Sequence, residues 1–190
     1  MRKAILLFSL LLLSSCVSLP QYPGGQRINL AGYSFVPPAD KQWSMLMMST
    51  YQTVLAAKGN NPKETFVIAA QIIQISTFTD KDEFLKYVQK GRAAEPQTGR
   101  FELIRNSEIL DSGRMETCVK HIAVSKDYGA KRGGLYTIFE TYGMNCIHPN
   151  NPKIDVFIEL SRKAPMESQS DELDKIGQEL LDSVKFSEFH

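Results

Sequence analysis

The sequence has few of the residues that most often carry chemistry. Its 190 residues include only three cysteines, three histidines and one tryptophan. It contains no P-loop, no dinucleotide-binding glycine pattern and no Gly-x-Ser-x-Gly motif for a nucleophilic serine. Neither sign of charge is in excess, since the formal net charge is +1. Nucleic-acid binding needs a concentrated basic face, so this balance argues against it.

Long hydrophobic runs are also missing, apart from one at the N-terminus. Arg2 and Lys3 precede an apolar stretch over 4–13, and small residues then lead to Cys16. The stretch is too short to span a bilayer, which takes about 20 apolar residues. Its order of charge, apolar run and small residues is that of a secretory signal peptide. We therefore expect export of the chain from the cytoplasm.

The segment Leu13-Ser14-Ser15-Cys16 resembles the lipobox of bacterial lipoproteins. The resemblance implies that residues 1–15 are removed as a signal peptide and that Cys16 becomes the lipidated first residue. Val17 and Ser18 follow, without the aspartate that often retains such proteins at the inner membrane. The resemblance thus implies an outer-membrane lipoprotein facing the periplasm. An ordinary signal peptide that happens to end at a cysteine is the alternative.

The mature chain is long enough for one domain with its own core. Its hydrophobic fraction of 43% and charged fraction of 23% are typical of globular proteins. Residues 16–30 are rich in proline and glycine, which predicts a lipidated cysteine on a flexible tether. Residues 31–190 are then expected to form a single α+β domain, an antiparallel sheet flanked by helices. Strands are predicted at 32–36, 43–55 (bent or divided), 65–75, 101–110, 115–126, 135–147 and 154–160, and helices from 80 to 91 and from about 170 to 184.

Three acidic residues near position 80 have a structural explanation. Asp80 can cap the N-terminus of the first predicted helix, and Glu83 stands three residues on, as in a capping box. Asp82 adds a negative charge where the helix dipole favours one. We therefore interpret these carboxylates as a helix start rather than a catalytic cluster.

Cys118 and Cys146 are expected to form a disulfide bond. The midpoint between them is Arg132, which lies inside the polar connection 127–134 between two predicted strands. In the simplest antiparallel register the two cysteines are therefore directly opposed, at a separation that a disulfide accepts. An exported chain also meets oxidising conditions. The alternatives are buried free thiols and a metal site that adds His148, although such a site lacks a fourth ligand at recognisable spacing.

The histidines and the basic hairpin tip do not point to catalysis. His121 lies within a predicted strand, His148 lies in a turn, and His190 is the last residue, so we expect structural or surface roles for all three. No metal site is predicted. The tip formed by Lys126, Lys131 and Arg132 could touch anionic head groups or a partner, but solvation is the simpler interpretation.

The methionines could form a thioether site for Cu(I), with Met45, Met47 and Met48 close in sequence and Met144 and Met166 elsewhere. The alternation of a strand places Met45 and Met47 on the same face as Trp43, and Met48 on the opposite face. We therefore expect core packing by adaptable side chains instead.

The mature chain resembles the PsbP-like fold over roughly residues 31–187. The resemblance rests on Gly-Tyr-Ser-Phe-x-Pro-Pro at 32–38, the Asp-Glu-Phe-Leu helix start at 82–85, the long hairpin and the end of the last helix. It implies an α/β/α sandwich that acts in binding or assembly rather than catalysis, and no functional residue transfers. The chain is more similar still to uncharacterised proteobacterial lipoproteins with a Cys-Ile-His-Pro turn, here at 146–149.

These observations predict a lipid-anchored cell-envelope binding or assembly module that is not an enzyme and has no cofactor. The lipid on Cys16 would attach it to the membrane, and its partner would be an envelope protein or a small ligand, not nucleic acid. Two alternatives remain open. One is an envelope hydrolase whose site is assembled from distant residues, and the other is a methionine-based metal carrier.

Overall fold

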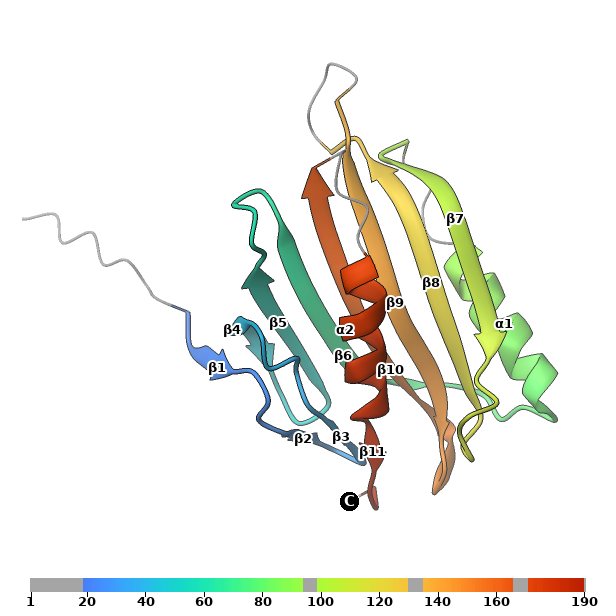
Figure 1. Ribbon diagram of the computed structural model, residues 1–190. Coiled ribbons are helices and arrows are strands. Elements are labelled where there is room, and N and C mark those ends of the chain that lie inside the picture. The colour runs from blue at the N-terminus through green and yellow to red at the C-terminus, as the bar shows by residue number, and fades with distance from the viewer. Residues whose placement is uncertain (1–18, 94–98, 130–134, 166–170, 190) are drawn as a thin grey trace, which may run out of the picture.

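A large antiparallel sheet dominates the computed structural model, which describes residues 19–93, 99–129, 135–165 and 171–189. Its eight strands lie in the order β1-β4-β5-β6-β10-β9-β8-β7, and a small second sheet has the order β11-β3-β2 (Figure 1). The elements in chain order are β1 (Gln21–Pro23), β2 (Ile28–Leu30), β3 (Tyr33–Phe35), β4 (Gln42–Met48), β5 (Gln52–Lys58), β6 (Thr65–Gln74), α1 (Lys81–Ala93), β7 (Phe101–Leu110), β8 (Cys118–Asp127), β9 (Thr137–His148), β10 (Asn151–Pro165), α2 (Asp171–Asp182) and β11 (Lys185–Phe186).

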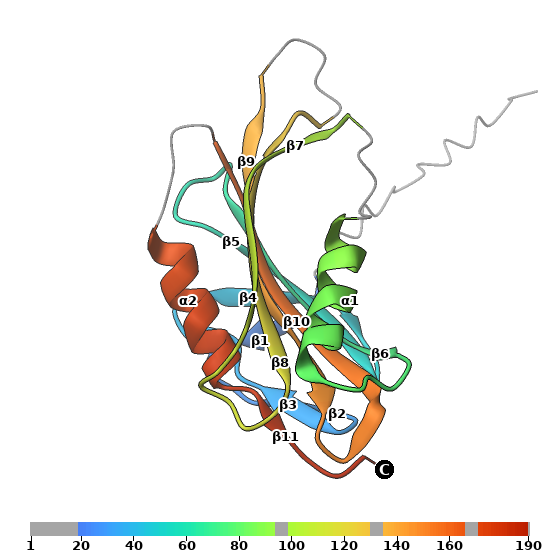
Figure 2. The same cartoon turned by 90° about the vertical axis from the view of Figure 1, so that its right-hand side faces the viewer.

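The fold is mainly β, so the predicted α+β class, an antiparallel sheet flanked by helices as in a PsbP-like sandwich, is wrong. Strands account for 53% of the structure and helices for 15%. The sequence pattern underestimated the strands, because β10 runs for 15 residues where a strand at 154–160 was expected. The two helices lie on opposite sides of the sheet, and each covers only part of its face (Figure 2).

Part of the predicted tether is folded. Gln21–Pro23 form β1, which pairs with β4, and Ile28–Leu30 form β2 in the small sheet. Ile28 is only 1% exposed and belongs to the core. The prolines that suggested a tether are compatible with a short strand at the sheet edge, where a missing N–H does no harm. The folded domain therefore begins before residue 31.

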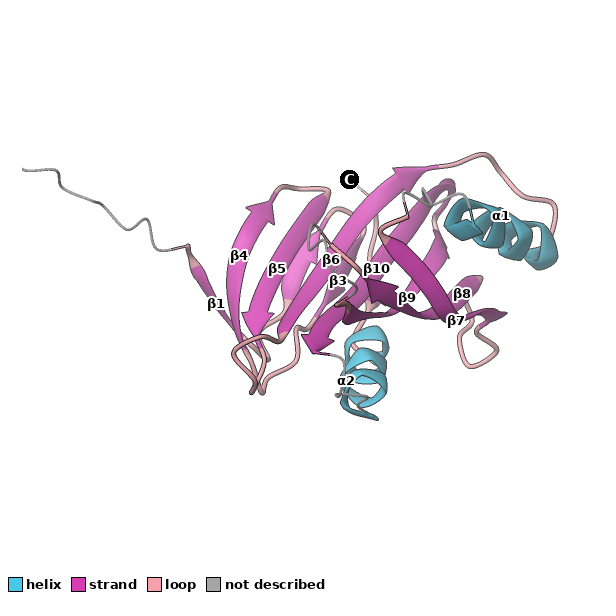
Figure 3. Cartoon of the chain, turned by 90° about the horizontal axis from the view of Figure 1, so that it is seen from above, coloured by secondary structure: helices cyan, strands magenta, loops and turns pink. Residues whose placement is uncertain are grey.

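The core consists of two clusters on opposite faces of the sheet. The larger one lies under α2 and the small sheet, and the smaller one lies under α1 (Figure 3). β6 shows how unequal the two faces are: Phe66 and Ile68 are fully buried, whereas Val67 and Ala69, which point to the other face, are only half-buried. The second face of this strand is only partly covered, because α1 does not extend over it.

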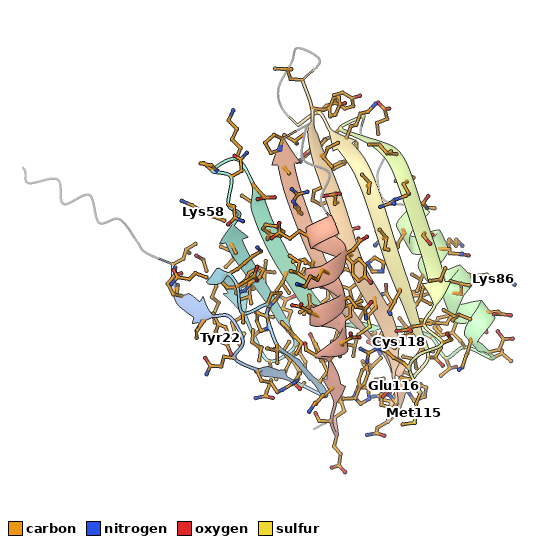
Figure 4. All side chains as sticks on the ribbon, in the orientation of Figure 1. Tyr22, Lys58, Lys86, Met115, Glu116 and Cys118 are labelled. Carbon is orange, nitrogen blue, oxygen red and sulfur yellow. A yellow bond between two sulfur atoms is a disulfide. The ribbon has the colours of Figure 1, made fainter. Side chains whose placement is uncertain are left out.

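The predicted disulfide is confirmed. Cys118 of β8 and Cys146 of β9 are directly opposed, with an S–S distance of 2.06 Å and a Cα–Cα distance of 4.1 Å. The same register continues along the hairpin to Asp127 and Thr137. Cys118 lies at one end of β8, close to Met115 in the preceding turn (Figure 4). The pair therefore fixes which residues of β8 and β9 face each other.

The N-cap predicted for α1 is present, although the second bond of the capping box goes to the N–H of Thr79 rather than to that of Asp80. The backbone N–H of Glu83 donates to Asp80 Oδ1 at 2.8 Å, and the N–H of Thr79 donates to Glu83 Oε2 at 2.6 Å. These carboxylates thus cap the helix, as expected. The helix continues past Gly91, where it was expected to end, and reaches Ala93. That extra length brings Arg92 over the sheet.

Candidate functional site

A network of partly and fully buried polar side chains lies between α1 and the sheet. Glu108 of β7, His121 of β8 and Glu159 of β10 form one row on the α1 face. Glu108 is directly opposite His121, and Gly143 of β9 lies between His121 and Glu159 and is opposite both. We call the whole set the His121 network, and it comprises Arg92, Glu108, His121, Thr141 and Glu159.

His121 is at the centre of the network and has no exposed side-chain surface. Its Nε2 lies 3.1 Å from Glu159 Oε2, and its ring stacks on Phe157 with centroids 5.9 Å apart. Gly143 leaves room for the ring, since a Cβ at that position would lie 2.4 Å from Nε2. The Nδ1 atom has no hydrogen-bond partner among the described residues.

Arg92 connects the last turn of α1 to three strands. One Nη atom lies 3.3 Å from Glu159 Oε2, and the other donates to the hydroxyl of Thr141 at 3.3 Å. Its Nε lies 3.6 Å from Glu108 Oε1. The guanidinium therefore holds the end of the helix against the sheet through groups that are at most 17% exposed.

Burial and charge set the protonation states of the network. Burial lowers the pKa of His121, and the nearby charge of Arg92 adds to this, although the hydrogen bond with Glu159 opposes it. For Glu159, burial alone would raise the pKa, but the hydrogen bond from His121 and the charge of Arg92 outweigh it and lower the pKa. Near neutral pH, a neutral imidazole therefore lies beside an ionised carboxylate.

A second buried carboxyl group lies farther along the same face. Asp155 is 1% exposed, and the side-chain amide of Asn145 donates to its Oδ2 at 2.6 Å. The other oxygen, Oδ1, has no hydrogen-bond partner among the described residues. Burial raises the pKa of Asp155 to about 7. This group therefore titrates near neutral pH.

The opposite face carries a buried ion cluster. The Nε of Arg162 lies 2.5 Å from Glu64 Oε1, and one Nη lies 2.6 Å from Glu140 Oε2. All three side chains are less than 10% exposed. Arg162 connects β9 and β10 to the turn before β6, which is a structural role.

The outer edge of the sheet at β7 is exposed along most of its length. This strand pairs with β8 on one side, and it is the last strand in the sheet order. Leu103, Ile104 and Ile109 are each more than half exposed, and Phe101 is 38% exposed. We call these four residues and their strand the β7 edge.

A second apolar surface lies at the opposite end of the sheet, where β1 meets the hairpin of β4 and β5. We call it the hairpin patch, and every member is between 44% and 54% exposed. Its members are Leu19, Leu46, Met47, Met48 and Tyr51.

Two recesses of about 460 and 490 Å³ lie on the described surface. The first lies beside α2, where Asp111 pairs with Arg114 at 3.5 Å and with Lys120 at 3.3 Å. The second lies between the β2–β3 turn and the β4–β5 turn, and Ser49 and Thr50 contribute to its wall. Neither recess includes a residue of the His121 network.

The methionines do not pack as the sequence predicted. A β-bulge between Met45 and Met47 shifts the register, so that Met45 opposes Leu55 and Met47 opposes the adjacent residue Val54. Met45 therefore packs against the core, while Met47 lies on the other face and is 46% exposed. Core packing is confirmed for Met144, which is fully buried, and is wrong for Met47 and for Met48, which is 44% exposed.

The structure places only some of the other candidate residues. His148 is buried, with Nε2 2.9 Å from the carbonyl oxygen of Gly32 and its ring edge-on to Phe186, as a structural residue would be. Lys126 pairs with Glu102 at 2.7 Å, so its charge is compensated. Outside the described residues lie Cys16, Lys131, Arg132, Met166 and His190.

Sequence reasoning missed the His121 network. The available signal was charge inside predicted strands: Asp155 and Glu159 both fall within the expected strand 154–160. A charged side chain in a buried strand needs a hydrogen-bonding or oppositely charged partner, so these two residues indicate that polar side chains from other elements lie close to them. Arg92 could not be found in this way, because the helix was expected to end at residue 91.

The described residues contain no group of histidine, cysteine, aspartate or glutamate side chains able to hold a metal ion. Within the same residues, neither helix has the length and apolar character needed to cross a membrane. No protein-family model matches the chain, and no curated protein matches it either.

Proposed function

We propose that this chain is a lipid-anchored module of the cell envelope that binds a protein partner. The lipobox-like segment ending at Cys16 supports the anchor, and the absence of aspartate after Cys16 supports the outer membrane. The partner lies in the periplasm in this proposal.

The exposed β7 edge is the observation that carries the binding role. A strand at the end of a sheet has backbone N–H and C=O groups pointing outward, and an extended segment of another protein can pair with them. Leu103, Ile104 and Ile109 supply apolar contacts along this edge. Backbone pairing would provide affinity, and these side chains would select the partner.

The His121 network supports binding better than catalysis. Its imidazole has no exposed surface, and its Nε2 is already engaged with Glu159. A general base must come within hydrogen-bond reach of a substrate proton, and this ring is closed off by Phe157 and Gly143. We assign the network to holding α1 on the sheet.

The proposed lipid anchor is tested by replacing Cys16, the residue that would accept the acyl chains. Cys16→Ala removes the thiol that would carry the acyl chains, so the protein should be found unprocessed or in the soluble fraction. Membrane fractionation after a high-salt wash, together with the mass of the mature N-terminal peptide, measures this. A Cys16→Ala protein that is cleaved like the wild type and still sediments with the washed membrane would overturn the anchor.

The binding role is tested by crosslinking from the β7 edge in intact cells. A photoreactive amino acid at Ile109 should capture a defined protein, while the same amino acid at Lys58 on β5 should not. Lys58 is a suitable control because it lies on the far side of the sheet from β7 (Figure 4).

The captured protein is then purified and its affinity measured. Ile104→Lys combined with Ile109→Lys should weaken binding by about tenfold or more, as expected for apolar side chains at an interface. Equal capture from Ile109 and Lys58, or unchanged affinity, would contradict binding at this edge.

A further inference from the structure

The hairpin patch lies where the chain enters the fold. Gln21 is opposite Ser44, and the backbone N–H of Met45 donates to the carbonyl oxygen of Pro20 at 2.8 Å. The chain therefore runs along β4 toward Leu46 as it is followed back to the N-terminus. Leu19 and the exposed residues of the β4–β5 hairpin gather at this point.

The distance from the anchor to this point is short. β1 begins at Gln21, so only residues 17–20 separate it from Cys16. A fully extended chain advances at most about 3.6 Å per residue, which gives a reach of about 18 Å. A lipid on Cys16 would consequently hold β1 and the neighbouring hairpin close to the bilayer surface.

The chemistry of the patch suits a bilayer surface. Between Lys41 and Lys58 the sequence has no acidic or basic residue, and none occurs over 17–26. Leucine and methionine side chains can enter the apolar region, and a tyrosine such as Tyr51 suits the interface. No charged group on these two segments would have to leave water when the patch meets lipid.

We propose that the hairpin patch docks on the bilayer that holds the anchor. This inference rests on the proposed lipidation of Cys16. The anchor makes docking intramolecular, so a modest apolar contact is enough to keep the domain on the surface. The β7 edge, at the other end of the sheet order, then points away from the patch and is free to bind a partner.

The proposal is tested with the full-length protein, processed and lipidated in its host and reconstituted in phosphatidylcholine vesicles. A fluorophore is placed on Met48→Cys and, as a matched control, on Ile104→Cys, whose side chains are 44% and 53% exposed. Spin-labelled phosphatidylcholine should quench the first fluorophore and not the second. Adding Leu46→Gln and Met47→Gln to the Met48→Cys protein should abolish the quenching, with circular dichroism confirming that the fold is intact.

The outcomes separate the two proposals. Acylated Cys16 with equal quenching at both positions would overturn docking and leave the anchored module standing. Acylated Cys16 with quenching at Met48→Cys that survives the glutamine substitutions would also overturn apolar docking. A mature N-terminal peptide without acyl groups would overturn the proposed function, and docking with it.

Discussion

Gly143 of β9 and His121 of β8 are directly opposite each other, and the His121 ring fits only because residue 143 has no side chain. A Cβ at position 143 would lie 2.4 Å from His121 Nε2 and 2.7 Å from the carbonyl oxygen of Ile158. Gly143→Ala should therefore lower the free energy of unfolding by about 1–3 kcal/mol, as overpacking does. Urea denaturation followed by circular dichroism measures the change.

Gly91→Ala is the matched control for this substitution. A Cβ at Gly91 would meet nothing within 4 Å, and the position is inside α1. It should stabilise the protein by about 0.5–1 kcal/mol, because alanine loses less conformational freedom in a helix than glycine. A Gly143→Ala protein as stable as the wild type would contradict the close contact with His121.

Asp155 makes stability depend on pH. Its pKa rises to about 7 in the folded protein, so between the unfolded pKa and pH 7 the folded state holds a proton that the unfolded state has lost. The free energy of unfolding therefore falls as pH rises through that window, and the stabilisation that the bound proton gives is lost above it. Asp155→Asn is neutral at every pH, so its free energy of unfolding should rise relative to the wild type by about 4 kcal/mol between pH 4 and pH 8.

Urea denaturation of both proteins across this pH range provides the measurement. His121 has a lowered pKa, so its own contribution changes in the opposite direction, growing as pH rises through its titration. Because His121 is present in both proteins, its effect cancels in their difference. A difference that does not change with pH would show that Asp155 is ionised throughout.

Among the elements, the β8–β9 hairpin carries the covalent constraint. The disulfide joins residues 28 positions apart, and the chain-entropy estimate for closing such a loop is about 3.5 kcal/mol. Replacing both Cys118 and Cys146 with serine should lower the free energy of unfolding by about that amount. The comparison is made by urea denaturation of the oxidised protein and the double variant, with the reduced wild type expected to match the variant.

The hairpin register and the α1 cap could be predicted because each depends on local pattern. The cysteine positions fixed the midpoint of the hairpin, and Asp80 and Glu83 have the spacing of a capping box. The bulge near Leu46 could not be predicted, since it inserts one residue without changing the apolar pattern of the strand. It moved Met47 to the other face and left it exposed.

The His121 network could not be predicted because its members come from five elements. Their proximity depends on the order of the strands and on the length of α1, and neither can be inferred from the spacing of residues along the sequence. The fold class was wrong for a related reason. Weak patterns at 21–30 and beyond residue 160 are strands only because neighbouring strands are there to pair with them.

For the whole molecule, the domain boundary has a direct consequence. A chain that starts at Ala31 lacks β1, β2 and the core residue Ile28, so it should be less stable than one that starts at Val17. The single tryptophan, Trp43, pairs with Tyr22 of β1 and is fully buried, so its fluorescence in urea reports the loss. Identical unfolding midpoints would contradict the inclusion of residues 21–30 in the fold.

The strand order also determines how a pulling force would be transmitted through the molecule. If the membrane holds the molecule at β1 and a partner pulls at β7, tension crosses all eight strands at right angles to their direction. When force acts across the strands in this way, the hydrogen bonds between two strands break one after another rather than all at once. Among the described residues, the disulfide between β8 and β9 is the only covalent cross-link between neighbouring strands. β1 pairs with β4 over only three residues, whereas β7 pairs with β8 over nine. A pulled molecule should therefore open first at β1, near the membrane, and the disulfide should keep β8 and β9 together longest.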